Sequence, residues 1–100
     1  MTPRGKKLPS GACPIKKTAE LLSDTWTILI VRDLLSGGKR FSELERHLET
    51  ISTRTLAVKL ERLIREKLAK KSGVAYALTA KGRHLGAIFD AMSKYGKKYL

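Results

Sequence analysis

The chain has 100 residues, and its 21 lysines and arginines against 9 aspartates and glutamates give a net charge of +12. This length fits one domain with one small core, and a hydrophobic content of 42% excludes a mainly disordered chain. No apolar run approaches the roughly 18 residues of a membrane span, and no apolar signal core follows the basic N-terminus, so we expect a cytoplasmic protein without membrane contact. The positive charge favours a polyanionic partner.

Residues 1–12 combine basic residues with glycine and proline and show no hydrophobic period, so they are predicted to form a flexible basic arm. A helix over 15–22 follows, opened by Pro14 and capped near Cys13. A thiol at a helix N-terminus near lysines favours its thiolate, which makes Cys13 a candidate redox sensor, although a partly buried, inert cysteine is the alternative. The single cysteine excludes an intrachain disulfide, and no Cys/His cluster indicates a metal, so no cofactor is expected.

The next helix begins at Asp24, its predicted cap, and carries apolar residues on more than one face as far as Leu35. Such a helix is typical of the centre of a fold, where it packs on several neighbours. Gly37 and Gly38 are predicted to stop it, and residues 39–41 to form a short edge strand.

Residues 41–67 predict a short helix, a tight turn and a longer helix. Ser42 is the predicted cap of the first, in a capping box with Glu45, and Ser52 the cap of the second, over 52–67. Four apolar residues share one face of the longer helix at helical spacing: Leu56, Leu60, Leu63 and Ile64. The opposite face is basic and hydroxyl-bearing, as in a DNA-reading helix, although a solvated charged face is the plain alternative.

After Lys67 the period changes to that of strands. Residues 68–71 and 74–78 predict a hairpin around Ser72-Gly73, which after a recognition helix is a wing, over 69–78. Lys70 and Lys71 could meet phosphate there, or serve solubility only.

Thr79 is the predicted cap of a last helical region, 80–100, which glycines could break in two. Its apolar stripe exceeds what so small a core needs, so with the first helix it is assigned to a homodimer interface. The predicted interface residues are Ile15, Leu22, Trp26, Leu85, Ile88, Phe89, Met92, Tyr95 and Tyr99.

This order of elements predicts a mainly α protein with a small β-hairpin wing, a winged helix-turn-helix over 13–100. Several phrases resemble the HxlR family of bacterial and archaeal winged-helix regulators; they lie at 13–15, 24–30, 32–35, 39–44, 51–56 and 76–83. The resemblance implies a prokaryotic, homodimeric transcription regulator with the 52–67 helix in the major groove. It also implies wings on the flanking DNA backbone and terminal helices in the dimer contact. Some members of that family sense electrophiles or oxidants through a cysteine that matches Cys13.

The function predicted is therefore sequence-specific binding to double-stranded DNA, with no effector identified. Arg54 is predicted to read guanine and Val58 to touch a thymine methyl group. The predicted DNA contacts are Arg40, Ser42, Ser52, Thr53, Arg54, Thr55, Val58, Lys59, Arg62, Lys70 and Lys71. The alternative is an abundant, non-specific nucleic-acid or chromatin-type binder, which the +12 charge favours. An enzyme is not expected, because His47 and His84 are isolated from any nucleophile or metal-ligand motif.

Overall fold

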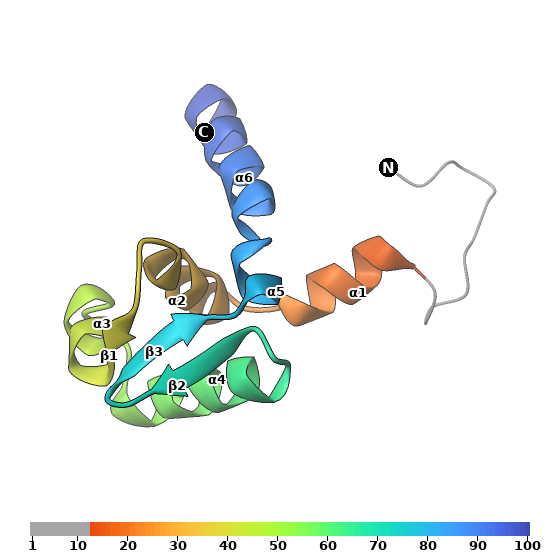
Figure 1. The fold of residues 1–100 in the computed structure, drawn as a ribbon. Helices are drawn as coiled ribbons and strands as arrows, with labels where there is room; N and C mark the ends of the chain where they lie inside the picture. Colours follow the sequence, from red (N-terminus) through yellow and green to blue (C-terminus); the bar gives the residue numbers. More distant parts are fainter. Residues whose placement is uncertain (1–12) are drawn as a thin grey trace.

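The structure, a computed structural model, describes residues 13–100; the predicted basic arm over 1–12 lies outside the described residues. The described part contains six helices and three short strands. Figure 1 shows how they are arranged. In chain order they are α1 (Pro14–Leu21), α2 (Thr25–Leu35), β1 (Lys39–Arg40), α3 (Phe41–His47), α4 (Thr53–Arg65), β2 (Ala69–Ser72), β3 (Ala75–Leu78), α5 (Ala80–Arg83) and α6 (Gly86–Tyr99). The predicted mainly helical class with a small β wing is confirmed.

Helix α2 lies at the centre of the fold, as predicted. Asp24 caps it by accepting a hydrogen bond from the backbone N–H of Thr27 at 2.9 Å. Ile30, Val31 and Leu34 are buried in a core to which α3, α4 and the sheet also contribute. The fully buried residues of α2 share one face at helical spacing, and Trp26, Leu29 and Leu35 beside that face are partly buried, so its apolar surface is wider than a narrow stripe.

The two helices of the helix-turn-helix begin differently from each other. Ser52 caps α4 as predicted, accepting from the backbone N–H of Thr55 at 3.0 Å. The predicted Ser42 cap of α3 is wrong, because the chain turns directly out of β1 and α3 already begins at Phe41. The capping carboxylate is therefore Glu43, which accepts from the backbone N–H of Arg40 at 2.9 Å.

Helix α4 buries Leu56, Leu60 and Leu63, as its period predicts, whereas Ile64 at the edge of that face remains 39% exposed. The helix ends in a Schellman motif. In this motif Leu68 N–H donates to the Leu63 carbonyl and Lys67 N–H to that of Ile64, both at 2.9 Å. Lys67 takes a left-handed backbone with φ of 62° at the position where glycine is commonest.

The sheet is antiparallel in the order β1-β3-β2, with the predicted short strand β1 at one edge. Lys39 of β1 and Lys71 of β2 both pair with Tyr76 of β3. The hairpin turn is Gly73–Val74, one residue later than the predicted Ser72-Gly73, because Ser72 already pairs with Ala75. Gly73 supplies the positive φ, 61°, that this two-residue turn requires.

The C-terminal helical region is broken in two, as the glycines predicted, between α5 and α6. Thr79 caps α5 by accepting from the Gly82 N–H at 3.1 Å and donates to the Lys67 carbonyl at 2.6 Å. The second bond ties the start of α5 to the turn that follows α4. Gly82 then lies against the backbone of Leu68, with no room for a side chain.

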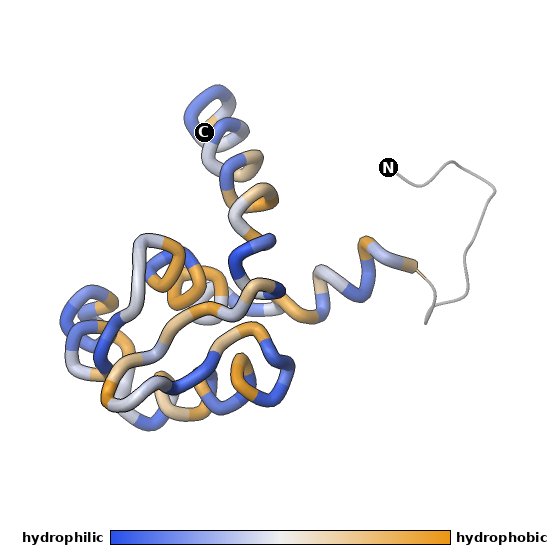
Figure 2. The backbone as a smooth tube through the Cα atoms, in the orientation of Figure 1, coloured by the Kyte–Doolittle hydropathy of each residue, from blue (hydrophilic) through white to orange (hydrophobic). Residues whose placement is uncertain are grey.

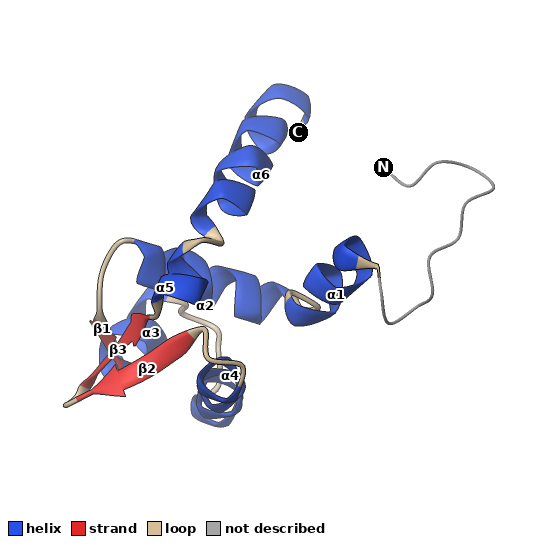
Figure 3. Cartoon of the chain, turned by 45° about the vertical axis from the view of Figure 1, so that its right-hand side comes forward, coloured by secondary structure: helices blue, strands red, loops and turns tan. Residues whose placement is uncertain are grey.

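Helices α1 and α6 project from this body in different directions (Figures 1 and 3). Neither helix contains a buried residue. Both nevertheless carry hydrophobic positions between hydrophilic ones, as the colouring in Figure 2 shows. The described chain thus consists of a packed body and two amphipathic arms. Each arm packs partly on the core, through Leu21 of α1 and Phe89 of α6, and leaves other apolar side chains exposed.

Gly82→Ala should lower the free energy of unfolding by at least about 1–3 kcal/mol, the usual cost of overpacking, because the new Cβ would collide with the Leu68 carbonyl oxygen. Gly96→Ala in α6 is the matched control, since nothing lies within 4 Å of its Cβ position. Alanine there should be neutral or stabilising by up to about 1 kcal/mol. Urea denaturation of both variants provides the comparison, and equal effects at the two glycines would contradict the close-approach argument.

Candidate nucleic-acid interface

The outward face of α4 presents an arginine beside a hydroxyl and an aliphatic side chain. Thr53 and Arg54 are exposed in its first turn, and Val58 is 51% exposed one turn later. Within the described residues Arg54 forms no hydrogen bond or ion pair, so its guanidinium is available to a ligand. An arginine can donate two hydrogen bonds to guanine, and an aliphatic group can contact a thymine methyl.

The hydroxyls around this first turn are already hydrogen-bonded inside the motif. Thr53 Oγ1 donates to Glu45 Oε2 of α3 at 2.6 Å, across the turn between the two helices. Ser52 Oγ donates to Thr55 Oγ1 at 2.8 Å while it caps the helix. Glu45, predicted as half of a capping box, therefore has a different role, holding the start of α4 against α3.

Lys59 and Arg62, also predicted to contact DNA, are half-buried and bonded to the junction of α1 and α2. Lys59 Nζ lies 3.1 Å from Asp24 Oδ2. Arg62 donates to Ser23 Oγ at 3.3 Å and to the Glu20 carbonyl at 2.8 Å. These two side chains attach the inner flank of α4 to the rest of the fold, and a contact with DNA would have to be made from this bonded position.

Asp24 combines two tasks at this junction, since its carboxylate caps α2 and pairs with Lys59. Its burial favours the neutral acid, but hydrogen bonds from Thr27 and the charge of Lys59 outweigh burial and lower its pKa below 3.8. The pKa of Glu43 is also lowered, chiefly by the Arg40 N–H that it accepts. Because both pKa values are lowered, both carboxylates are charged at neutral pH.

The remaining predicted DNA contacts lie on β1, α3 and the wing. Arg40 and Ser42 are exposed where β1 runs into α3. Lys70 and Lys71 are exposed on β2, and Lys71 Nζ lies 5.6 Å from the centre of the Tyr76 ring. In Figure 3 the β2–β3 hairpin projects to one side of α4, the arrangement of a wing beside a reading helix. His47, by contrast, is paired with Asp33 at 2.9 Å between α3 and α2.

Cys13 is the N-cap of α1, as predicted, and its Sγ accepts a weak hydrogen bond from the Lys16 N–H at 3.5 Å. It is half-buried and unpaired. The described residues hold no group of three or more His, Cys, Asp or Glu side chains that could bind a metal. In the same part of the chain, no helix combines the length and apolarity of a membrane span.

The predicted interface residues divide into three groups by burial. Leu85 belongs to the core of the chain itself, with 7% of its surface exposed, so its place in an interface is wrong: it packs at the break between α5 and α6. Three others, Leu22, Trp26 and Phe89, are partly buried against that core. The outward-facing ones are Ile15 on α1 and Ile88, Met92, Tyr95 and Tyr99 on α6.

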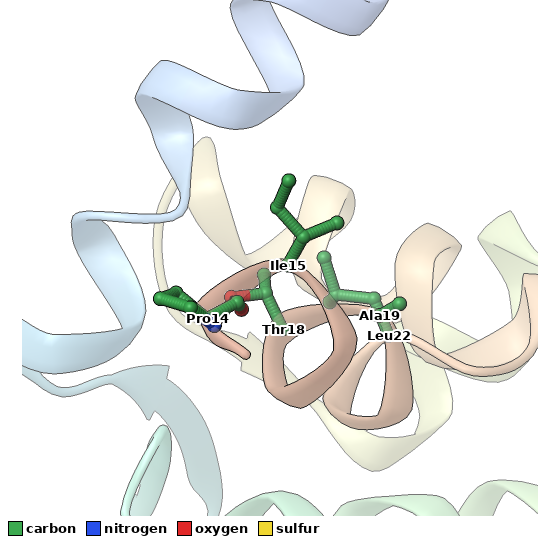
Figure 4. A pocket seen from close by; sticks show the side chains of 5 residues that line it. All are labelled: Pro14, Ile15, Thr18, Ala19 and Leu22. Atoms are coloured by element: carbon green, nitrogen blue, oxygen red, sulfur yellow. The ribbon is translucent and has the colours of Figure 1, made fainter. Parts of the chain in front are cut away.

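Two shallow apolar grooves run along these arms. One of about 400 Å³ follows α1 and is lined by Pro14, Ile15, Thr18, Ala19 and Leu22. Figure 4 shows Ile15, Ala19 and Leu22 extending from the same side of the helix. The other, about 320 Å³, lies between α2 and α6 beside Ile28, Phe89 and Met92.

Stability should depend on both tasks of Asp24. Asp24→Ala should cost about 1–2 kcal/mol, since it removes the cap and the partner of Lys59, whereas Asp24→Asn keeps a capping oxygen and should cost less. The lowered pKa means that the unfolded chain binds the proton more tightly. The contribution of the charged Asp24 is thus complete above pH 3.8 and is lost as pH falls through the folded-state pKa. Urea unfolding from pH 2 to 6 should show wild type and Asp24→Asn converging at the acid end; a constant difference would contradict the assignment.

Comparison with known proteins agrees with this geometry. The model of the HxlR-like helix-turn-helix family matches residues 21–100. The HTH-type transcriptional regulator YvaP of Bacillus subtilis, itself uncharacterized, is 35% identical over 99 residues, covering 91% of this chain and 92% of YvaP. The crystal structure of quinone-bound YodB from B. subtilis superposes with a TM-score of 0.82 at 33% identity, over 87% of this chain and all of that one. The redox regulator HypR in its reduced form gives a TM-score of 0.78 at 26% identity, over 86% of this chain and 92% of HypR. The chain is a winged helix-turn-helix protein and belongs to the HxlR-like family of transcriptional regulators.

Proposed function

We propose that this protein binds specific DNA sequences as a homodimer, with α4 in the major groove and the wing, residues 69–78, on the DNA backbone. The observation that carries the proposal is the exposed, unpaired Arg54 in the first turn of α4, beside Thr53 and Val58. In a helix-turn-helix, the N-terminal residues of the second helix are those that meet base edges. The protein acts by binding and not by catalysis.

In this proposal the base contacts and phosphate contacts come from different elements. Arg54 reads guanine through O6 and N7, and Val58 contacts a thymine methyl. Ser42, Ser52, Thr55 and the cations Arg40, Lys70 and Lys71 meet the backbone, which fixes the register of the protein on the duplex. Lys59 and Arg62 contribute positive charge at the flank of α4 while they hold that helix to α1 and α2.

The homodimer is supported by the two arms. Ile15 on α1, and Met92, Tyr95 and Tyr99 on α6, would leave apolar surface in water on a lone chain. Apolar burial is the main favourable term in association, and a two-fold dimer is the commonest way to cover such a surface. Such a two-fold dimer would bind two DNA half-sites about 34 Å apart, which is one helical turn of DNA. Residues 13–100 form the DNA-binding and dimerising domain in this proposal.

The second candidate is a non-specific nucleic-acid binder, favoured by the net charge of +12. Selection from a random duplex library at physiological salt should separate the two, because non-specific affinity falls steeply with salt. A specific regulator should enrich a palindrome and exceed its affinity for bulk DNA by about 10³-fold or more. Tight binding with no enrichment would favour the non-specific binder instead.

Arg54→Ala should weaken binding to the selected site by about 1–3 kcal/mol and relax selection at one base pair per half-site. Lys70→Ala is the matched control on the wing. It should weaken all sequences about equally and lower the dependence of log K on log salt by about one unit. Fluorescence anisotropy across a salt series, with the selected and a scrambled duplex, measures both effects. Uniform weakening by Arg54→Ala would instead make Arg54 a phosphate contact.

We also propose that Cys13 makes DNA binding sensitive to oxidants. Cys13 lies at the start of the α1 arm, and one similar structure is that of a redox regulator. In the simplest step, diamide takes two electrons and two protons from the Cys13 thiol and a second thiol, leaving a disulfide. The second thiol is Cys13 of the other subunit or a small thiol such as glutathione.

Diamide, with and without glutathione, should therefore change the DNA affinity of the wild type and leave Cys13→Ser unchanged. Dithiothreitol should restore the wild-type value, which separates a disulfide from irreversible damage. Anisotropy titrations before and after each treatment make the comparison. An identical response of the two proteins would remove the sensor role.

A further inference from the structure

We infer that Glu45 and Thr53 form a reader of exocyclic amino groups, selecting adenine or cytosine on the contacted strand. The inference rests on the proposed binding of α4 in the major groove. It starts from the 2.6 Å hydrogen bond between Thr53 Oγ1 and Glu45 Oε2.

The direction of this bond is fixed by chemistry. A threonine hydroxyl has one hydrogen and two acceptor lone pairs, whereas an ionised carboxylate only accepts. The hydrogen therefore belongs to Thr53 and points at Glu45. Toward the outside, Thr53 retains lone pairs and its methyl group but no donor.

The neighbouring carboxylate atoms are also hydrogen-bond acceptors. Glu45 Oε1 has no hydrogen-bond partner within the described residues, so a second acceptor lies beside the threonine oxygen. Both residues lie at the junction of α3 and the first turn of α4, and Thr53 is exposed. A patch that only accepts hydrogen bonds thus adjoins Arg54, which only donates them.

Base edges in the major groove distinguish these polarities. Adenine N6 and cytosine N4 donate hydrogen bonds, whereas guanine O6 and N7 and thymine O4 accept. An acceptor-only patch facing guanine or thymine would place oxygen against oxygen and leave these groups unpaired. Glu45 and Thr53 therefore select adenine or cytosine, while the adjacent Arg54 selects guanine.

Selection from the random library with full-length wild type and Glu45→Gln tests this assignment. Glutamine keeps the size of the side chain and can still accept from Thr53, but its NH₂ group adds a donor. The wild type should enrich adenine or cytosine at one position beside the Arg54-dependent guanine. Glu45→Gln should reduce that preference about tenfold, by admitting guanine or thymine there, and leave the guanine selected.

Two further variants control for charge and for the threonine. Glu61→Gln removes a carboxylate from α4 with no base contact assigned to it, and it should leave every base preference unchanged. Thr53→Val keeps the shape but loses the oxygen, and it should weaken the same position that Glu45→Gln affects. Thermal unfolding of each variant verifies that the fold persists.

The outcomes separate this inference from the proposed function. If the wild type selects a palindrome but Glu45→Gln and Thr53→Val reproduce all its preferences, the reader assignment is wrong and the regulator stands. If the wild type selects nothing, both fail together. A wild-type preference for guanine or thymine that depends on Glu45 would also overturn the assignment.

Discussion

The placement of α4 on α2 is the constraint on which the rest of this structure depends. Leu56, Leu60 and Leu63 bury one side of α4 in the core that α2 centres, and burying each such side chain stabilises the fold by about 1.5–3 kcal/mol. Burial has no direction of its own, so it would also permit small rotations or shifts of α4. Polar contacts remove that freedom: the Asp24–Lys59 pair anchors one flank, and the Glu45–Thr53 bond anchors the first turn. The exposed side chains of α4 thereby keep fixed positions relative to the rest of the fold.

Some cations of α4 hold the helix in the fold, and another is left exposed. Arg54 is left unpaired at the surface, while Lys59 and Arg62 hold the α1–α2 junction. Arg62 bonds to the Glu20 carbonyl in the last turn of α1, so the arm that carries Cys13 and the reading helix share a direct contact. A change in the position of α1 would therefore act on a residue of α4. The position of α1 and DNA binding would be coupled if α1 had a second stable position and if DNA binding changed the population of that position.

Much of this fold could be predicted from local chemistry alone. The caps at Asp24, Ser52 and Thr79 follow from side chains that satisfy free backbone N–H groups, and the buried leucines follow from helical spacing. The Ser42 cap failed because the start of α3 is set by β1, and β1 exists only through pairing with β3, far along the chain. The contacts of Lys59 and Arg62 could not be predicted for the same reason, because they depend on residues far along the chain. Periodicity places them away from the leucines, but only the tertiary position of the α1–α2 junction shows what lies beside them.

The candidate site illustrates the same limit at finer scale. The basic face of the helix indicated a nucleic-acid partner. Arg54 lies exposed on that face, as the helical period predicts. The Glu45–Thr53 bond was not predictable, because it depends on the angle between α3 and α4 across the turn where Glu49 adopts a positive φ of 44°. The interface prediction is affected likewise. A stripe from Leu85 to Tyr99 is continuous in sequence, but Leu85 at the break after α5 is buried and Phe89 packs partly on the core, so only Ile88, Met92, Tyr95 and Tyr99 are exposed. The apolar surface left for a partner thus begins one turn later, and it lies on an arm that the body of the protein does not cover.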